Sequence, residues 1–577
     1  MTLIDWLMIA GYFSVLAMVV VFTLRRRKIA TGEDLFLGGR SVGWLAVGAS
    51  LFAANIGSEH LIGLAGSGAS VGLSQAHWEL NSWIIVMMAR VFLPFYYKSG
   101  VTTMPEFLER RFGAKARWLL SLVSLAAYVL TKISVTVFAG AVFFEVMLPD
   151  IHLAVGDAVI GPFWIGAAIT VVLAGLYSSI GGLSAVVYTD IVQTGIILIG
   201  TLSVTGFALH HLGTVSPDGG WTVLKETIRS TGNAENFDIW HPLSHPTVPW
   251  LGILIASATA GVWYWCTDQF IVQRTLAARN LTEARRGVLF GSLLRFTPVF
   301  LFLVPGMLGF ALHHNHVEIA GKVFAIPLKT LADGTRTLNA DTVFPTLVQT
   351  ILPTGFRGLV VAGMIAALMS SLASLFNSVS TLFTMDVYMK LRPDTSPRCQ
   401  VTIGRLTTVG MTVLGLLWLP VMKSISTGGL YQYLMAVQSF LAPPIVAVFV
   451  GGLVWRRMNL RGAIWGLGAG FVFGMSKLAV NILFTGSSGV LGRVAAFQDY
   501  YFSGVLLGLS ALIVFVASLS APALSDRQVR GLTFACLGED FKRENRASWT
   551  WREVVASVAI VGLVLAAYAY FTTWLHQ

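Results

Sequence analysis

Apolar segments of about 20 residues recur along the whole sequence, from Trp6 to Tyr570, and the polar breaks between them are mostly short. A helix needs about 20 consecutive apolar residues to cross the hydrocarbon core of a bilayer. The composition agrees, because 55% of the 577 residues are hydrophobic, 12% are charged and the mean hydropathy is +0.73. We therefore predict an all-α membrane protein with about fourteen transmembrane helices. They are expected to begin near Leu7, Leu45, Trp78, Trp118, Phe163, Ala185, Leu251, Val288, Leu359, Leu406, Leu430, Ile464, Phe502 and Val554.

Basic residues indicate how these helices are oriented, because Lys and Arg accumulate in cytoplasmic loops. The cluster from Arg25 to Lys28 follows the first apolar segment and no small-residue cleavage site comes after it, so the first helix is expected to stay in the mature protein. Placing both termini outside puts most of the 39 Lys and Arg residues in inside loops. We expect a multi-pass protein of the cell (plasma or inner) membrane with both termini outside.

Several other classes of function are disfavoured. A net charge of +11 and a pI near 9.6 would favour nucleic-acid binding in a soluble protein, but here the basic residues lie where membrane insertion places them. Cys266, Cys399 and Cys536 are an odd set without a CxxC spacing, which argues against a disulfide framework or a cysteine metal site. No nucleophile with a base, nucleotide loop or metal cluster is found, so we do not expect an enzyme.

The longest inside loop is expected at 520–552 and carries a basic run from Phe541 to Arg546. This run could touch the anionic headgroups of the lipid bilayer. The alternative, a solvated connector that obeys the bias of cytoplasmic loops toward Lys and Arg, is favoured.

Two of the predicted helices look interrupted. The segment LFAANIGSEHLIGLAGSGAS, within Ser50 to Ser70, places polar residues from Asn55 to His60 in the middle of an apolar span. Its counterpart ASATAGVWYWCTDQFIV, Ala256 to Val272, has Gly261 in the middle and Asp268 near the end. Paired discontinuous helices in two halves of a chain mark the binding site of an inverted-repeat transporter, because unwound backbone is tolerated only around a cavity. For Gly63, Gly66 and Gly68, which follow His60, close packing of small residues is the favoured interpretation.

Ionisable residues inside the membrane are costly and point to function. Glu79 and Lys132 fit deep positions, and with the His60 imidazole they suit a neutral polyhydroxylated ligand, which needs donors, acceptors and a flat apolar face to stack on. Aromatic side chains that can supply such faces are Trp78, Tyr264, Trp265 and Tyr431.

Small hydroxyl side chains crowd the stretch AALMSSLASLFNSVSTLFTMD, Ala366 to Asp386. Sodium prefers about five or six hard oxygens, which hydroxyls and freed carbonyls provide without fixed charge. Serines in membrane helices also bond their own carbonyls, which is the simpler interpretation of Ser374 and Ser378. The adjacent pair Ser370 and Ser371 is the better sodium candidate.

With these residues in place, the chain resembles the sodium/glucose cotransporters of the solute:sodium symporter family. The likeness runs from about Glu33 to Met458 and is most specific in the stretches FLGGRSVGWLAVGASLFAANIGSEHLIGLAGSG, YSSIGGLSAVVYTDIVQT, WYWCTDQFIVQR and LAPPIVAVFVGGLVWRR. It implies a LeuT-type 5+5 inverted-repeat bundle and alternating access. The domains implied are an extra helix with its loop at 1–40, a ten-helix transport core at 41–455, and accessory helices at 456–577.

The resemblance also implies roles for individual residues. A sodium site is expected from the carbonyls of Ala53, Ile56 and Ala367 and the hydroxyls of Ser370 and Ser371. Substrate-binding positions are Asn55, His60, Glu79, Lys132, Tyr264 and Met435, and gate positions are Trp78, Tyr264, Trp265 and Tyr431. A weaker second sodium site would use Asp190 and Ser374, but Ala373 stands where relatives that carry two ions have Thr, so one sodium per substrate is expected.

Three positions depart from the pattern of sugar carriers: Met435 replaces Gln, Gly261 replaces Asn or Thr, and Arg295 replaces Lys. The expected function is nevertheless sodium-coupled import of a sugar, a hexose such as glucose or galactose. Alternatives are a sodium-coupled myo-inositol or polyol carrier, and a sugar sensor or sodium-leak channel that does not transport its ligand. The particular sugar and the oligomeric state are left open by the sequence.

Overall fold

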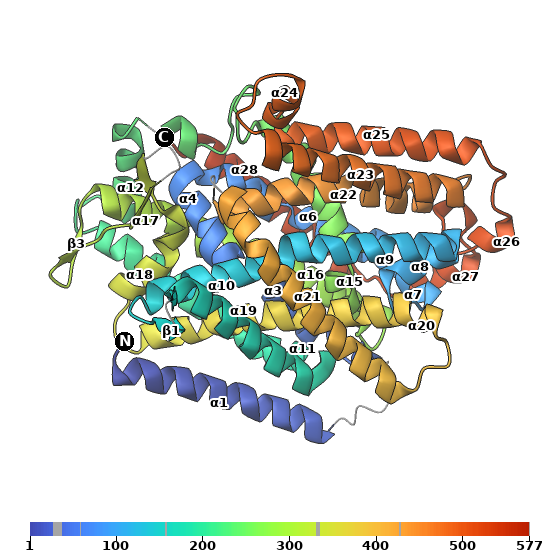
Figure 1. Cartoon of the computed structure of the whole chain (residues 1–577), viewed down its shortest axis with the longest axis horizontal. Coiled ribbons are helices and arrows are strands. Elements are labelled where there is room, and N and C mark those ends of the chain that lie inside the picture. Colours follow the sequence, from blue (N-terminus) through green and yellow to red (C-terminus); the bar gives the residue numbers. More distant parts are fainter. Residues whose placement is uncertain are drawn as a thin grey trace.

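The fold is described from a computed structural model, which covers residues 1–26, 37–57, 59–155, 158–232, 234–330, 335–425 and 429–575. Long helices run roughly parallel to one another between two ends of the molecule (Figure 1). The N- and C-termini lie at the same end, together with α12 and the short strands, whereas α26 and α27 lie at the opposite end (Figure 1).

The first half of the chain contains one long peripheral helix, two helices that change direction, and a 51-residue helix. The elements are α1 Leu3–Arg26, η1 Gly38–Arg40, α3 Trp44–Asn55, η2 Glu59–Leu64, α4 Ala65–Val71, η3 Gly72–Gln75, α5 Ala76–Glu79, α6 Ser82–Met87, η4 Met88–Phe92, α7 Leu93–Ser99, α8 Met104–Phe112, α9 Ala114–Tyr128, η5 Val129–Ile133, α10 Ser134–Met147, β1 Leu153–Val155, β2 Ala158–Ile160, α11 Pro162–Leu212, α12 Gly220–Ser230, α13 Ala234–Phe237, α14 Trp250–Gly261, η6 Val262–Thr267 and α15 Gln269–Leu276.

The second half repeats the alternation of long helices and short connectors. Its elements are α16 Leu281–Leu294, η7 Val299–Leu303, α17 Val304–His314, β3 Glu318–Ile319, β4 Lys322–Val323, β5 Leu328–Thr330, β6 Arg336–Leu338, η8 Ala340–Thr342, α18 Val343–Ile351, α19 Phe356–Thr381, η9 Leu382–Tyr388, α20 Met389–Leu391, α21 Pro397–Ile425, α22 Leu430–Val454, α23 Leu460–Phe484, α24 Val490–Ala496, α25 Asp499–Leu519, α26 Asp526–Val529, η10 Phe534–Cys536, α27 Glu539–Ala547 and α28 Trp551–Thr573. The strands pair in sequence as three small antiparallel hairpins, β1–β2, β3–β4 and β5–β6.

Among the described residues, 12 helical segments are long and apolar enough to cross a membrane, and α3 and Pro162–Val172 are shorter apolar helices. The prediction of an all-α membrane bundle is confirmed, and every predicted span begins in or beside a helix. One expectation differs in detail: the two spans predicted to begin near Phe163 and Ala185 form a single helix, α11. The adjacent Gly181 and Gly182 lower helix propensity, but without a proline they do not stop the hydrogen-bond ladder.

Small residues let the central helices approach closely. A Cβ on Gly48 of α3 would lie 2.7 Å from the carbonyl oxygen of Gly287 in α16, and a Cβ on Gly287 would lie 2.6 Å from the Cβ of Val47. Close approach at small residues replaces the hydrophobic effect as the force between membrane helices. α3 is thereby fixed against α16, which brings the two halves of the core together.

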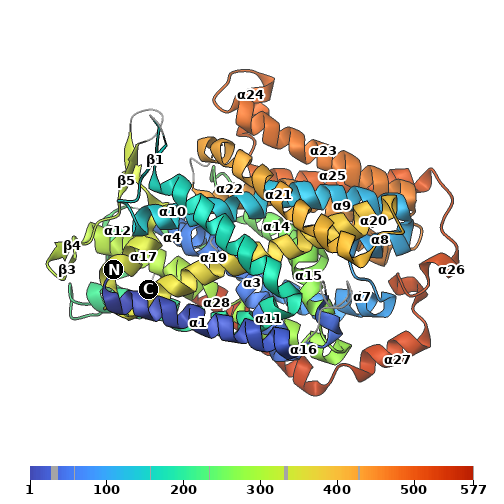
Figure 2. The ribbon, with the colours of Figure 1, turned by 60° about the horizontal axis from the view of Figure 1, so that its bottom comes forward.

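The first helix is attached through one buried carboxylate. α1 lies along the outside of the bundle against α19 (Figure 2). The Oδ1 of Asp5 accepts the amides of Gly355 at 2.8 Å and Gly358 at 3.2 Å, and its Oδ2 pairs with Arg357 at 2.8 Å. These bonds satisfy open amides in the first turn of α19, where a negative charge is favoured.

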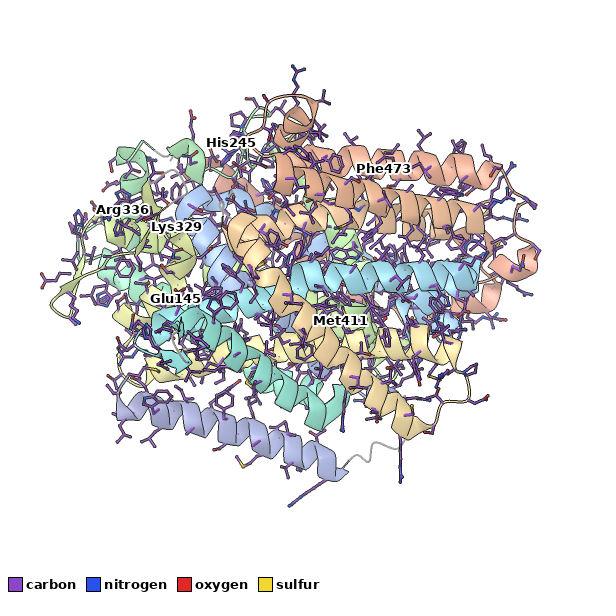
Figure 3. All side chains as sticks on the ribbon, in the orientation of Figure 1. Glu145, His245, Lys329, Arg336, Met411 and Phe473 are labelled. Carbon is purple, nitrogen blue, oxygen red and sulfur yellow. The ribbon has the colours of Figure 1, made fainter. Side chains whose placement is uncertain are left out.

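Charged and apolar side chains occupy different zones of the surface. Lys329 and Arg336 lie at the end that carries the termini, whereas Met411 and Phe473 lie along helices between the two ends (Figure 3). Large apolar side chains such as Leu417 and Leu483 are exposed on those helices. An exposed apolar belt between two polar ends fits a protein surrounded by lipid.

Candidate functional site

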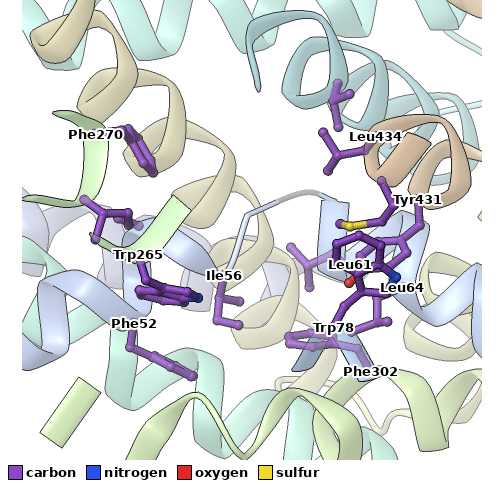
Figure 4. Packing of buried hydrophobic residues seen from close by; sticks show 14 of the residues in the cluster. Phe52, Ile56, Leu61, Leu64, Trp78, Trp265, Phe270, Phe302, Tyr431 and Leu434 are labelled. Carbon is purple, nitrogen blue, oxygen red and sulfur yellow. The ribbon is translucent and has the colours of Figure 1, made fainter. Parts of the chain in front are cut away.

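The first discontinuous helix breaks where the sequence predicts. α3 ends at Asn55, and the Gly57 amide donates to the Asn55 carbonyl at 2.9 Å instead of to the Ala53 carbonyl one turn back. The chain then resumes as the π-helical turn η2 and continues as α4. The break is lined on opposite sides by Phe52, Ile56 and Trp265 and by Leu61, Trp78 and Tyr431 (Figure 4).

The second discontinuous helix breaks later than Gly261. α14 passes into the wider turn η6, and the extended residue is Asp268, with φ −83° and ψ 128°. Its carboxylate caps α15 by accepting the Phe270 amide at 3.2 Å, and it also accepts the Tyr128 hydroxyl and pairs with the Lys132 ammonium. Because its charge is balanced this way, Asp268 can hold the broken helix against η5 inside the membrane.

A small cavity of about 40 Å³ lies between the two breaks. It is lined by Asn55, Glu59, His60, Trp78, Glu79, Asn81, Ala260, Gly261, Tyr264, Trp265, Arg295, Tyr431, Leu434, Met435 and Gln438. Ligand pockets usually measure about 300–1,000 Å³, so this site is contracted and a sugar requires side chains to move outward.

Glu79 is the centre of the polar network in this cavity. Its side chain is fully buried, and its Oε1 accepts the Tyr431 hydroxyl at 2.6 Å. Its Oε2 pairs with the Arg295 guanidinium, which also donates to the Trp78 carbonyl at 3.0 Å and to the His60 Nε2 at 3.1 Å. A buried pair with hydrogen bonds on both partners can remain ionised at membrane depth.

Three buried polar atoms of the cavity residues have no hydrogen-bond partner among the described residues: His60 Nδ1, Asn81 Oδ1 and Arg295 Nε. Buried polar atoms are normally paired, and exceptions call for an explanation. The set includes both donors and acceptors, which is what a ligand with several hydroxyl groups can satisfy.

The residues predicted to hold sodium lie beside the break of α3. Ala53, Ile56 and Ala367 are fully buried, and a Cβ on Gly57 would lie 3.0 Å from the Ser371 Oγ. The Ser371 hydroxyl is buried without a hydrogen-bond partner among the described residues. A hydroxyl oxygen in that position fits a cation bound between α3 and α19.

Asp190 connects the same region to α11. Its Oδ1 accepts the Ser370 hydroxyl and its Oδ2 accepts the Ser50 hydroxyl, both at 2.6 Å, and Arg274 donates to Ser50 at 3.0 Å. The Ser374 hydroxyl is buried and has no partner among the described residues. Asp190 therefore contacts Ser370 of the first predicted sodium set, and Ser374 lies one helical turn after Ser370 on α19.

The predicted gate residues lie on opposite sides of the cavity. Trp78 is 3% exposed and contacts the Tyr500 ring at 5.6 Å, and Tyr431 is 1% exposed. Tyr264 is only half-buried and packs edge-on against Trp265 at 5.1 Å. Trp78 and Tyr431 are thus more deeply buried than Tyr264, and their roles as gates stay a prediction.

Two placements bear on the substrate prediction. Lys132 pairs with Asp268 and lies over the Tyr264 ring at 4.5 Å, outside the residues that line the cavity, so its direct contact with substrate remains a prediction.

Gln438, which sequence reasoning missed, lines the cavity three residues after Met435 on α22. Residues three apart share a helix face, so spacing from Met435 was the signal that could have found it.

The chain matches known proteins over most of its length. The model of the sodium:solute symporter family matches residues 35–470. Sodium/glucose cotransporter 1 of Sus scrofa is 38% identical over 544 residues, covering 90% of this chain and 80% of that protein. Sodium/myo-inositol cotransporter 2 of Homo sapiens is 37% identical over 545 residues, covering 91% and 77%.

A solved structure matches the fold. A substrate-bound, outward-open Na⁺-coupled sialic acid symporter aligns with a TM-score of 0.69 at 20% identity, over 91% of this chain and 99% of that chain. The two discontinuous helices, one at the start of each half, fit the LeuT-type inverted repeat. The chain therefore belongs to the sodium:solute symporter family and has its LeuT-type helical bundle.

Proposed function

We propose that this protein is a sodium-coupled symporter that imports a hexose by alternating access. The observation that carries the proposal is the position of the α3 break, which has a buried polar cavity on one side and the unpartnered Ser371 hydroxyl nearby in α19. One short segment of chain can thus respond to both the ion and the substrate. Relatives named as sodium/glucose cotransporters support the choice of cargo.

Glu79 couples substrate binding to the outer gate in this account. Its bonds to Tyr431 and Arg295 connect α5, α22 and the end of α16. Sugar hydroxyls compete for these groups and for His60, so ligand entry requires the Tyr431 side of the cavity to open. When the network re-forms around the ligand, the outer route closes and the route past Tyr264 becomes the exit.

Sodium contributes by stabilising the broken form of α3. An ion bound to the Ala53, Ile56 and Ala367 carbonyls and the Ser370 and Ser371 hydroxyls would tie α3 to α19 and orient Asn55 and His60 toward the cavity. One ion per sugar is proposed because Ala373 offers a methyl group where a second site needs an oxygen. Asp190 is then a structural acceptor for Ser50 and Ser370.

The substrate is proposed to be a neutral polyol with a ring. Gln438 can supply the carboxamide that Met435 lacks, and Trp265 and Tyr431 supply aromatic faces. Sodium/myo-inositol cotransporters are also among the relatives, which keeps inositol as the second candidate. A sensor or leak channel remains the alternative from another class.

Orientation and domain organisation complete the proposal. The end that carries the termini is proposed to face outside, because the loops predicted to be inside then hold most of the Lys and Arg residues. The core at 41–455 performs transport, with 1–40 and 456–577 as accessory segments in the plasma or inner membrane.

Uptake by purified protein in liposomes tests this function. Radiolabelled glucose, galactose and myo-inositol would be offered with inward sodium or potassium gradients. We expect sodium-dependent accumulation of a hexose, inhibited by the unlabelled compound. Binding without accumulation would instead support the sensor, and exclusive uptake of inositol would replace the hexose as substrate.

A further inference from the structure

A second cavity lies away from the transport site, on the surface of the bundle. It has a volume of about 440 Å³ and lies between α16, α28 and the first turn of α3. Its length is lined by apolar side chains: Leu289, Phe290 and Leu293 from α16, and Ala556, Ala559 and Ile560 from α28. Leu293 is 43% exposed, so this groove opens toward the surrounding membrane.

One end of the groove is charged. Arg286, Arg552 and Glu553 line it there, close to the loop between α27 and α28. The Glu553 carboxylate forms an ion pair with Arg286, with 2.8 Å between Oε1 and Nε, and so neutralises its charge. Glu553 also forms a capping box with Thr550 at the start of α28. Arg552 forms no ion pair among the described residues, so the charged end carries a net positive charge.

An aromatic side chain marks the level of the membrane surface. Trp44 is 40% exposed and packs edge-on against Phe290 at 5.6 Å. Tryptophans with this amphipathic placement concentrate at the headgroup level of bilayers. The two guanidinium groups are therefore at headgroup depth, and the apolar side chains of α16 and α28 extend from them toward the hydrocarbon core.

We infer that this groove is a binding site for one anionic phospholipid. Its phosphate would lie between Arg286 and Arg552, because guanidinium groups match phosphate oxygens in charge and geometry. An acyl chain would follow Leu289, Leu293 and Ile560. Basic pockets between membrane helices typically select anionic headgroups, and a sugar is disfavoured because few polar groups converge along the apolar part.

The site is placed to act on transport. α16 forms one wall of the groove, and Arg295, the partner of Glu79, follows directly after this helix. Gly287 of α16 packs on α3. A lipid wedged between α16 and α28 contacts the helix that positions Arg295. Occupancy would therefore stabilise the closed network around Glu79.

Native mass spectrometry of the full-length protein in detergent tests the inference, with palmitoyl-oleoyl phosphatidylglycerol and its phosphatidylcholine counterpart as probes. We expect a preference for phosphatidylglycerol that falls about fivefold in Arg552→Gln, the loss typical of one basic residue near a membrane surface. Arg530→Gln removes an exposed charge of the same inside loop outside the groove and should leave the preference unchanged.

A steric variant tests the acyl part separately. Ala556→Phe fills the groove and should weaken binding of both lipids; Ala559→Leu serves the same purpose if the first variant does not fold. Equal binding of both lipids by the wild type, or an equal effect of Arg552→Gln and Arg530→Gln, would overturn the site. Displacement of the bound lipid by millimolar inorganic phosphate would overturn it too, because it would identify an anion site rather than a lipid site.

Discussion

The pair formed by Glu79 and Arg295 offers the sharpest test of the substrate site. The Glu79 side chain is 0% and the Arg295 side chain 8% exposed, so the pair is effectively desolvated. Glu79→Gln leaves Arg295 as a buried cation without its counter-charge. Breaking a buried pair in this way costs about 3–5 kcal/mol of stability. Glu79→Gln should therefore lower the thermal unfolding temperature in detergent, whereas Arg295→Lys, which keeps the charge, should be milder.

Substrate affinity separates a binding role from a structural one. A hydrogen bond to a charged group contributes about 1.5–3 kcal/mol, which corresponds to roughly 10- to 150-fold in affinity. Glu79→Gln should weaken sugar binding within this range at saturating sodium, measured by a scintillation proximity assay. His60→Ala should also weaken it, because its imidazole lies in the same network at 3.5 Å from Glu79.

A double mutant shows whether the two residues act together. Glu79→Gln combined with Arg295→Gln removes both charges, and we expect it to be more stable than Glu79→Gln alone because no unpaired charge remains. Wild-type sugar affinity in a folded, sodium-responsive Glu79→Gln protein would show that Glu79 does not bind the substrate. Strict additivity of the two stability changes would show that the two residues do not act together.

Four further outcomes are expected. Ser371→Ala should raise the sodium concentration for half-maximal uptake about tenfold or more, whereas Ser378→Ala, whose hydroxyl bonds its own helix, should not; equal effects would remove Ser371 from the site. Gln438→Leu should weaken sugar binding in equilibrium assays, and unchanged binding would leave Gln438 a packing residue. Burial raises the pKa of the Asp341 carboxyl to about 6, so between about pH 6 and 4 the folded protein binds a proton that this carboxyl does not bind in the unfolded chain. Thermal stability should therefore rise on acidification through this range, and Asp341→Asn should reduce that rise. Ala373→Thr should move the ion stoichiometry from one toward two, and an unchanged reversal potential would show that this methyl does not decide it.

The helical spans could be predicted from sequence because they depend on local composition. Apolar runs located the helices, and the polar residues between Asn55 and His60 located the first break. The continuous α11 was not foreseen, because hydropathy falls at Gly181 and Gly182 although the backbone stays helical. Glycine lowers helix propensity by about 1 kcal/mol, which neighbouring helices can offset.

Several residues that line the cavity could be named from the sequence, but their side-chain partners could not. Glu79, His60 and Tyr431 all line the cavity, as expected. The sequence does not show, however, that Arg295 pairs with Glu79 or that Asp268 pairs with Lys132. Those pairs join segments between 136 and 216 residues apart, so they depend on helix packing rather than on spacing. Gln438, in contrast, lies three residues after Met435 on the same face of α22, so its position could have been predicted from spacing alone.

In the proposed mechanism, sodium movement drives sugar movement through one chain. One sodium ion crossing about 100 mV gains roughly 2.3 kcal/mol, and a tenfold gradient adds about 1.4 kcal/mol. Together these sustain accumulation of about 400-fold at one sodium per sugar. The decisive measurement is the reversal potential of sugar flux in proteoliposomes at fixed sodium and sugar gradients. We expect a value that moves with the sodium gradient in a one-to-one ratio, and sugar flux that reverses only with the sugar gradient would contradict sodium coupling.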